Sequence, residues 1–252
     1  MLRGVEVDVD AAREFGFFFA LAGKAGQLLG EMRFTWWRDA LEAMAGGTSV
    51  PDHPVSQALA NLVASGQLDL EACLALIEVR RRDLDAEGFV NEADLTRYAA
   101  GTAGQLNRLT AALSGLEGEA LDQAERLGTA WGLIGQLRSY DAWRRRGRIW
   151  LPQSLLHQAG LTRGALLEGE DKGALAGVAQ GLAASAEALL SGVRQRRPGL
   201  PSAGSAFLLG TLSRFYLGRL AACRYDLTDP ALALLPPGRV FRLTWAVLRR
   251  RW

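Results

Sequence analysis

Apolar residues recur every three or four positions along most of the chain, which is the spacing of one face of an α-helix. The clearest case is the segment 28–47, whose apolar positions are Leu29, Met32, Phe34, Trp36, Trp37, Leu41 and Met44. The Gly-Gly pair at 46–47 is expected to end this helix. Similar patterns predict further helices over 54–66, 68–88, 91–115, 117–145, 168–195, 203–225 and 239–252.

Alternation typical of a β-strand is brief and isolated, as in "VEVDVD" at 5–10. We therefore predict an all-α fold, a single helical bundle that takes up residues 1–252 as one domain. Within it, Asn91 is expected to cap a helix at Asp94. The small residues Gly101, Ala103 and Gly104 are expected to allow two helices to approach closely.

Composition narrows the class of protein. The 252 residues are 49% hydrophobic, which is enough for a large core, and a net charge of only +2 gives no reason to expect a nucleic-acid partner. Lys24 and Lys172 are the only lysines, a bias that suggests a GC-rich bacterial genome. The apolar run at 15–23 is too short to span a membrane and follows acidic residues, so a cytoplasmic protein is expected.

Four segments carry family-like motifs in a consistent order: "MRFTWWRDALE" (32–42), "RRDLDAEGF…LTRYAAGTAGQLNRL" (81–109), "LGTAWGLIGQLRSYDAWRRRGRIWLPQSLL" (127–156) and residues 216–248. Together they resemble the squalene/phytoene synthase family, the head-to-head isoprenoid synthases. The resemblance runs from about residue 28 to the end. It implies an isoprenoid-synthase-like bundle in which two aspartate-rich motifs on facing helices hold magnesium ions that bind prenyl diphosphates.

The aspartates that this family needs are missing from the expected positions. When the chain is aligned on Gly147 and Arg148, the two aspartates of one motif fall on Ser139 and Trp143. Asp141 lies between them and points about 200° away from each position on a helix. The other motif is expected within residues 12–31, which contain no aspartate. The chain thus resembles degenerate members of the family related to a mitochondrial complex I assembly factor, and we predict no metal site and assign no catalytic residue.

An active enzyme with a shifted Mg²⁺ site is the alternative, with Asp83, Asp39 and Asp141 as its candidate residues. Asp39 and Glu42 are spaced to share a helix face, but ion pairing with Arg38 or with a neighbouring helix is the favoured interpretation. Asp83 and Glu87 lie four residues apart and could form a displaced metal site. The alternative interpretation of this pair is a solvated helix end.

Four arginines, Arg138, Arg144, Arg145 and Arg148, are candidates to bind a diphosphate or an anionic lipid head group. Their alternative interpretation is a solvated helix C-terminus, where cations favour the helix dipole. The residues Trp36, Tyr98, Gly104 and Trp131 are candidates to line a cavity for an isoprenoid or lipid ligand. Packing in the core would use the same residue types.

The last segment, 239–252, contains five arginines and no acidic residue, interleaved with aromatic and aliphatic residues. It fits either a packed final helix or peripheral contact with an anionic membrane surface at the inner face of the membrane. The function that the sequence predicts is non-catalytic binding or assembly, related to lipid or to a respiratory complex and involving a protein partner. The alternative is an active prenyl-diphosphate transferase.

Overall fold

The computed structural model describes residues 27–85, 87–170, 172–193, 204–234 and 238–249, and these ranges contain helices and no β-strand. The expected all-α fold is confirmed. The α-helices are α2 (Gln27–Ala45), α3 (Pro54–Ala64), α4 (Leu70–Arg80), α5 (Glu92–Ala99), α6 (Gln105–Leu113), α7 (Glu119–Arg144), α8 (Gln153–Gln158), α9 (Arg163–Glu168), α10 (Lys172–Ser191), α11 (Gly204–Ala222) and α12 (Arg239–Arg249). The segments 5–10 and 15–23 lie outside the described residues.

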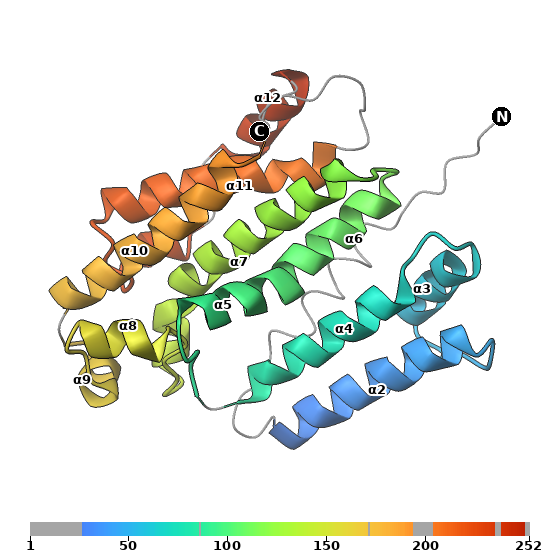
Figure 1. The fold of residues 1–252 in the computed structure, drawn as a ribbon, viewed down its shortest axis with the longest axis horizontal. Coiled ribbons are helices and arrows are strands. Elements are labelled where there is room, and N and C mark those ends of the chain that lie inside the picture. The colour runs from blue at the N-terminus through green and yellow to red at the C-terminus, as the bar shows by residue number, and fades with distance from the viewer. Residues whose placement is uncertain (1–26, 86, 171, 194–203, 235–237, 250–252) are drawn as a thin grey trace.

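Helix α7 is the centre of the bundle. Figure 1 shows it between α5 and α6 on one side and α10 and α11 on the other. Its 26 residues include apolar side chains that are almost completely buried, among them Leu127, Leu133, Ile134 and Leu137. A helix that buries residues on most of its circumference must be surrounded by other helices, and α7 meets that requirement.

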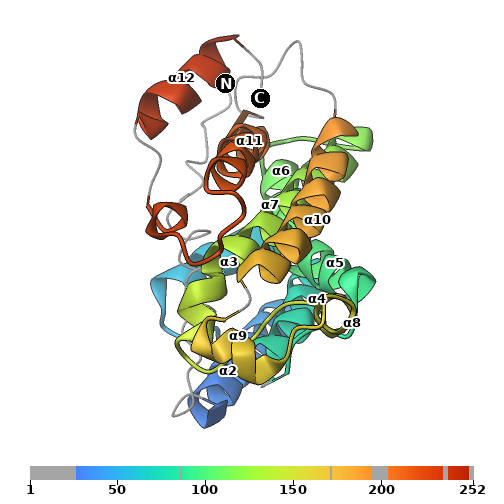
Figure 2. The same ribbon diagram turned by 90° about the vertical axis from the view of Figure 1, so that its left-hand side faces the viewer.

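Helices α2, α3 and α4 form a second group beside α5 and α6, as Figures 1 and 2 show. This group has its own buried cluster, in which Phe34, Trp37 and Leu41 of α2 pack with Cys73, Leu76 and Ile77 of α4. Leu109 of α6 also belongs to the cluster, so the second group packs directly against α6.

The predicted helix over 117–145 agrees closely with α7, whereas three other predicted helices differ. The segment 68–88 ends as an α-helix at Arg80 and continues as a 3₁₀ turn, Arg81–Leu84. The segment 91–115 is interrupted by a π-helical turn, Ala100–Gly104. The segment 168–195 is α10, which starts only at Lys172 because a separate short helix, α9, ends at a left-handed Gly169.

The predicted helix ends that depend on local chemistry are confirmed. The side chain of Asn91 accepts a hydrogen bond of 2.9 Å from the backbone N–H of Asp94, which satisfies a donor at the start of α5. Helix α2 ends at Ala45, and Gly47 follows with a φ of +62° that a residue with a side chain adopts only with strain.

The π-helical turn is the point of closest approach to α7. A Cβ atom on Gly104 would lie 2.6 Å from Oγ1 of Thr129. A Cβ atom on Gly128 would collide with the carbonyl oxygen of Ala103 and lie 2.8 Å from Cα of Gly104. The expected role of Gly104 in close helix approach is therefore confirmed, and Gly128 is its counterpart on α7.

Replacing Gly128 with alanine should lower the free energy of unfolding by about 1–3 kcal/mol, because the added methyl group meets backbone atoms that cannot rotate away. Urea unfolding of the purified protein measures this. Gly135→Ala is the matched control, since it lies in the same helix and its Cβ atom would have nothing within 4 Å. That control should raise the stability by up to about 1 kcal/mol through helix propensity. Equal effects of the two substitutions would contradict the close approach.

Candidate functional site

A buried polar cluster joins the end of α4 to α5. Asp83 lies in the 3₁₀ turn and Tyr98 in α5, and their side chains are only 6% and 5% exposed. The hydroxyl of Tyr98 donates a short hydrogen bond to Oδ1 of Asp83. Arg80, the last residue of α4, donates to Oδ2 of Asp83 at 3.2 Å and to the Tyr98 oxygen at 3.1 Å. Both carboxylate oxygens of Asp83 are thus engaged within the protein.

Burial dominates the electrostatics of this cluster. It raises the pKa of Asp83 above its usual range, and the neighbouring guanidinium of Arg80 opposes that shift only in part. Burial likewise raises the pKa of Tyr98, so its phenol stays protonated and available as a donor. The interpretation of Asp83 as part of a solvated helix end is wrong, because the α-helix stops before it and the 3₁₀ turn directs it inward. Glu87 lies beyond that turn and is exposed.

The chain after α7 closes over the same cluster. Arg148 donates to the backbone carbonyl oxygens of Asp83, at 2.9 Å, and of Asp85. Its guanidinium also lies 5.6 Å from the ring centre of Trp143 and 5.1 Å from that of Trp150. These two indoles stack on each other with ring centres 5.4 Å apart. Arg148 therefore holds the turn around Asp83 in place.

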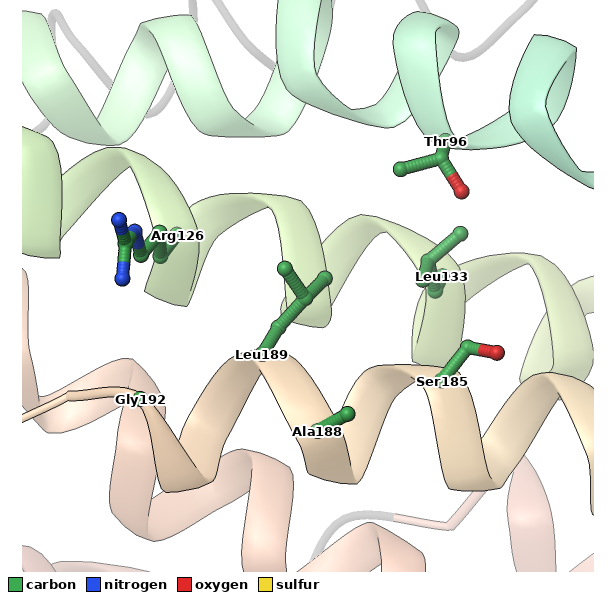
Figure 3. Close-up of a pocket in the computed structure, with 7 residues that line it drawn as sticks. All are labelled: Thr96, Arg126, Leu133, Ser185, Ala188, Leu189 and Gly192. Carbon is green, nitrogen blue, oxygen red and sulfur yellow. The ribbon is translucent and has the colours of Figure 1, made fainter.

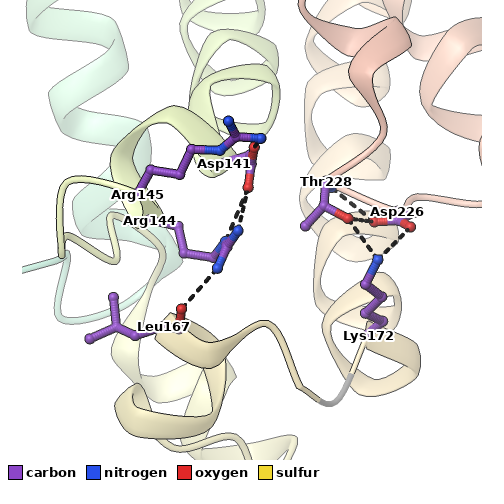
Figure 4. Close-up of polar contacts among 7 residues, drawn as sticks. All are labelled: Asp141, Arg144, Arg145, Leu167, Lys172, Asp226 and Thr228. Carbon is purple, nitrogen blue, oxygen red and sulfur yellow. Dashed lines mark hydrogen bonds and ion pairs between the residues drawn. The ribbon is translucent and has the colours of Figure 1, made fainter.

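Asp141 is paired with two of the candidate arginines, as Figure 4 shows. Arg144 donates to its Oδ1 at 3.0 and 2.8 Å, and Arg145 approaches Oδ2 at 2.7 Å. Arg144 also reaches the carbonyl oxygen of Leu167 at 2.8 Å, which ties the end of α7 to α9. Partial burial raises the pKa of Asp141, but the hydrogen bonds from both arginines outweigh it, and the net shift is downward.

Arg138 occupies a different environment from the other three candidate arginines. Its guanidinium lies 3.6 Å from the ring centre of Tyr216 and 5.4 Å from that of Trp131, and its Nε donates to the carbonyl oxygen of Leu232 at 3.2 Å. Burial lowers the pKa of this guanidinium. The four candidate arginines therefore lie in three separate sets of contacts: Arg144 and Arg145 share Asp141, Arg148 holds the Asp83 turn, and Arg138 packs against α11.

The positions of the missing aspartates are filled by other contacts. The hydroxyl of Ser139 donates to the carbonyl oxygen of Gly135, one turn earlier in α7, at 2.8 Å. Trp143 takes part in the indole stack. Asp39 lies on α2 with a side chain 62% exposed, 3.7 Å from Nε of Arg38, as its ion-pairing interpretation expected. Within the described residues, no three His, Cys, Asp or Glu side chains are grouped so that they could hold a metal ion. The carboxylates of this described part of the chain therefore do not fit the Mg²⁺ that the family resemblance implies, while most of the stretch 12–31 lies outside it.

The four cavity candidates are distributed over three helices and the π-helical turn. Trp36 is 38% exposed on α2, where its ring lies 4.8 Å from that of Trp37. Trp131 of α7 faces Tyr216 of α11 at 5.9 Å. Tyr98 belongs to the buried polar cluster, and Gly104 to the contact between the π-helical turn and α7.

A pocket of about 390 Å³ lies between α5, α7 and α10 and is open to solvent. Figure 3 shows its lining, with Arg126 and Gly192 at one end and Thr96, Leu133 and Ser185 at the other. None of the four cavity candidates borders it. Leu133 precedes Trp143 by ten residues, which turns the two side chains about 80° apart around α7, so the pocket and Trp143 do not lie in line on one face of that helix.

Sequence reasoning missed the role of Arg80, which binds both Asp83 and Tyr98 in the buried cluster. It stands first in a run of three arginines that reads as a solvated charge run, yet each of them pairs with a different carboxylate. Arg80 binds Asp83, while Arg81 binds Glu31 at 2.8 Å and Arg82 binds Asp94 at 2.7 Å. The only signal in the sequence was the three-residue spacing between Arg80 and Asp83, which places both side chains on one side of a helical turn.

Replacing Asp141 with asparagine should lower the free energy of unfolding by about 1 kcal/mol at pH 7, because two arginines lose a charged acceptor. The pKa of Asp141 is lower in the folded chain than in the unfolded one. Its contribution is therefore present above the unfolded pKa of about 4 and is lost as the pH falls through the folded pKa.

The difference between wild type and Asp141→Asn should accordingly shrink in denaturant unfolding experiments below about pH 4. Asp39→Asn is the control, since that exposed pair should change the stability by less than about 0.5 kcal/mol. A difference for Asp141→Asn that stays constant from pH 7 to pH 3 would contradict the ionic origin of the effect.

The chain was compared with known proteins. The family model described as "Squalene/phytoene synthase" matches residues 22–246. Among curated proteins, the mouse NADH dehydrogenase (ubiquinone) complex I, assembly factor 6, is 25% identical over 222 residues, which are 86% of this chain and 66% of the mouse protein. Presqualene diphosphate synthase of Rhodopseudomonas palustris is 31% identical over 128 residues, 50% of this chain and 45% of that enzyme. The chain thus spans just under two thirds of the assembly factor and less than half of that enzyme.

A solved dehydrosqualene synthase structure superimposes with a TM-score of 0.75 over 96% of this chain and 85% of that one, at 20% identity. The structure of a squalene synthase from Alicyclobacillus acidocaldarius superimposes with a TM-score of 0.66 over 82% of this chain and 77% of that one, at 22% identity. These likenesses confirm the expected isoprenoid-synthase-like bundle. Since the family model also matches nearly the whole length, the chain belongs to the squalene/phytoene synthase family.

Proposed function

We propose that this member of the family is non-catalytic and acts by binding or in assembly. The observation that carries the proposal is that the candidate carboxylates are already paired with arginines. Asp83, Asp141 and Asp39 each lie beside arginines of the protein itself, in three different places. A carboxylate already bound to a guanidinium would have to give up that contact before it could ligate a cation, so these three do not form a shared magnesium site.

The aspartate motif that aligns with Ser139 and Trp143 supports the same proposal. A magnesium-binding helix of this family presents two carboxylates spaced by four residues, and here those positions are Ser139 and Trp143. The stack of Trp143 on Trp150 is backed by Arg148, so a large apolar side chain takes the place of a metal ligand. Changing Trp143 back to aspartate would remove this packing, because an aspartate side chain is far smaller than an indole.

The likeness to the complex I assembly factor directs the proposal toward assembly. The sequence of that protein aligns with 86% of this chain at 25% identity. The sequence of presqualene diphosphate synthase aligns with only 50% of it. We infer a role connected with a respiratory complex or with lipid, carried out with a protein partner. An isoprenoid or lipid is the proposed small ligand, with Trp36, Tyr98, Gly104 and Trp131 as candidate contacts.

An active prenyl-diphosphate transferase with a shifted Mg²⁺ site is the alternative. Its strongest support is Asp83, which lies buried beside Tyr98 in a segment that matches the family. The alternative needs the Asp83–Arg80 pair to open and further carboxylates to join it. The exposed Glu87 and the distant Asp39 offer no such ligand without a change in the turn after α4.

For localisation, we propose a cytoplasmic protein bound peripherally to the inner face of the membrane of a bacterial cell. Among the described residues, α10 is the single helix whose length and apolar content would suffice to cross a bilayer. It packs along α7 and buries Leu175, Leu182 and Leu190 in the main core. Peripheral contact therefore fits the bundle better than a membrane span.

The purified protein should release no pyrophosphate from farnesyl or geranylgeranyl diphosphate in the presence of Mg²⁺, because the carboxylates of the described residues form no shared site for the Mg²⁺ that neutralises the leaving group. A coupled pyrophosphate assay measures this, with an active presqualene diphosphate synthase as the positive control. Robust release that disappears in Asp83→Asn or in Asp39→Asn would overturn the proposal and establish the transferase. Asp39→Asn is the more telling variant, since its exposed position leaves the fold intact.

A further inference from the structure

Helix α12 lies at the edge of the molecule. Figure 2 shows it beyond α11, away from α7 and from the group of α2, α3 and α4. Its contact with the bundle is made to α11, where the guanidinium of Arg242 lies 5.3 Å from the ring centre of Phe215. Leu243 is partly buried. One side of the helix is therefore attached to the bundle.

That outer side is apolar and aromatic. Phe241, Trp245 and Leu248 are 71%, 46% and 71% exposed. Spacings of four and three residues place them on one face of the helix. The rings of Phe241 and Trp245 stack with centres 6.1 Å apart, so the face presents a continuous surface rather than scattered side chains. Exposed apolar surface of this kind marks a place of interaction.

The charge of the same segment identifies the chemistry of the partner. Residues 239–252 contain five arginines and no acidic residue, while the whole protein carries a net charge of only +2. The positive charge is therefore a local property of this segment. A helix with a basic composition and a face of Phe, Trp and Leu matches the pattern of helices that lie in the interface of an anionic bilayer. Arginines then contact the head groups while the aromatic side chains enter the acyl boundary.

We propose that α12 is the membrane-binding element of this protein, and that it inserts Phe241, Trp245 and Leu248 into the surface of an anionic bilayer. A second copy of the chain is the competing occupant of this face. A symmetric pair of α12 helices would bring two segments with five arginines each together, and their repulsion opposes that arrangement. An anionic lipid surface instead supplies the opposite charge.

The inference rests on the peripheral localisation proposed above and is independent of whether the protein is catalytic. The test is flotation of the full-length protein with large vesicles at low and at high salt. One set of vesicles contains phosphatidylcholine alone, and the other contains phosphatidylcholine with roughly 30–40% anionic lipid, which gives a strong negative surface potential. Wild type should bind the anionic vesicles at low salt, bind less at high salt and bind neutral vesicles little.

Two variants separate the contributions of charge and of the apolar face. Arg249→Ser, Arg250→Ser and Arg251→Ser combined should lower the partition coefficient by about 100-fold at low salt, since each surface cation contributes roughly fivefold. Phe241→Ser with Leu248→Ser should lower it by about tenfold or more while leaving the salt dependence in place. Both substituted side chains of the second variant are largely exposed, so its circular dichroism and melting temperature should match wild type.

The matched controls change equally exposed residues elsewhere. Leu28→Ser with Val90→Ser removes two apolar side chains that are 75% and 64% exposed, and should leave binding unchanged. Arg97→Ser with Arg145→Ser removes two arginine side chains, each 73% exposed, and should have a smaller effect than the α12 triple variant.

The outcomes distinguish the two levels of the proposal. If wild type binds neither vesicle type at low salt, the peripheral localisation itself fails. If wild type binds anionic vesicles but the α12 variants bind equally well, the localisation stands and the role of α12 is overturned. A dimer in sedimentation analysis that the Phe241→Ser, Leu248→Ser variant converts to a monomer, without loss of vesicle binding, would assign the face to a second copy and also overturn the inference.

Discussion

The close approach of the π-helical turn to α7 is the contact on which the rest of the bundle depends. It is possible only because Gly104 and Gly128 carry no side chains where the two backbones meet. The turn connects α5 to α6, so this single contact sets the distance of both helices from α7. It also sets the position of Tyr98, two residues before the turn, and with it the cluster around Asp83.

The candidate arginines of this protein are held by contacts with the protein itself. Arg144 and Arg145 share Asp141, while Arg148 and Arg138 use backbone carbonyl oxygens and aromatic rings. Guanidinium groups suit this role because they are planar, stack on aromatic faces and donate several hydrogen bonds in fixed directions. The contact of Arg144 with Leu167 and those of Arg148 and Arg138 with backbone carbonyl oxygens also join segments far apart in the chain. Residues that a diphosphate could bind in a relative of this chain therefore serve here as connections between helices.

The proposed function follows from a contrast between the interior of the bundle and the outer face of α12. The interior of the described bundle contains packed side chains and a polar cluster in which both oxygens of Asp83 are engaged by the protein itself. The outer face of α12, in contrast, exposes aromatic and apolar surface next to a basic sequence. The proposed non-catalytic role at a membrane surface rests on this contrast and on the likeness to a complex I assembly factor.

The sequence by itself determined the class of fold and the order of the helices. Helical periodicity is a local property, so α7 could be predicted almost to the residue, and Asn91 and Gly47 could be recognised as helix ends because capping depends on neighbours in the chain. The absence of aspartates at 139 and 143 was visible in the same way. Only the tertiary structure decided which charges meet. Arg80, Arg81 and Arg82 look alike in sequence but pair with Asp83, Glu31 and Asp94, since the choice among distant carboxylates depends on how helices pack. Asp83 could be taken for a solvated helix end for the same reason: its burial comes from α5 and from Arg148, which lies 65 residues further along the chain.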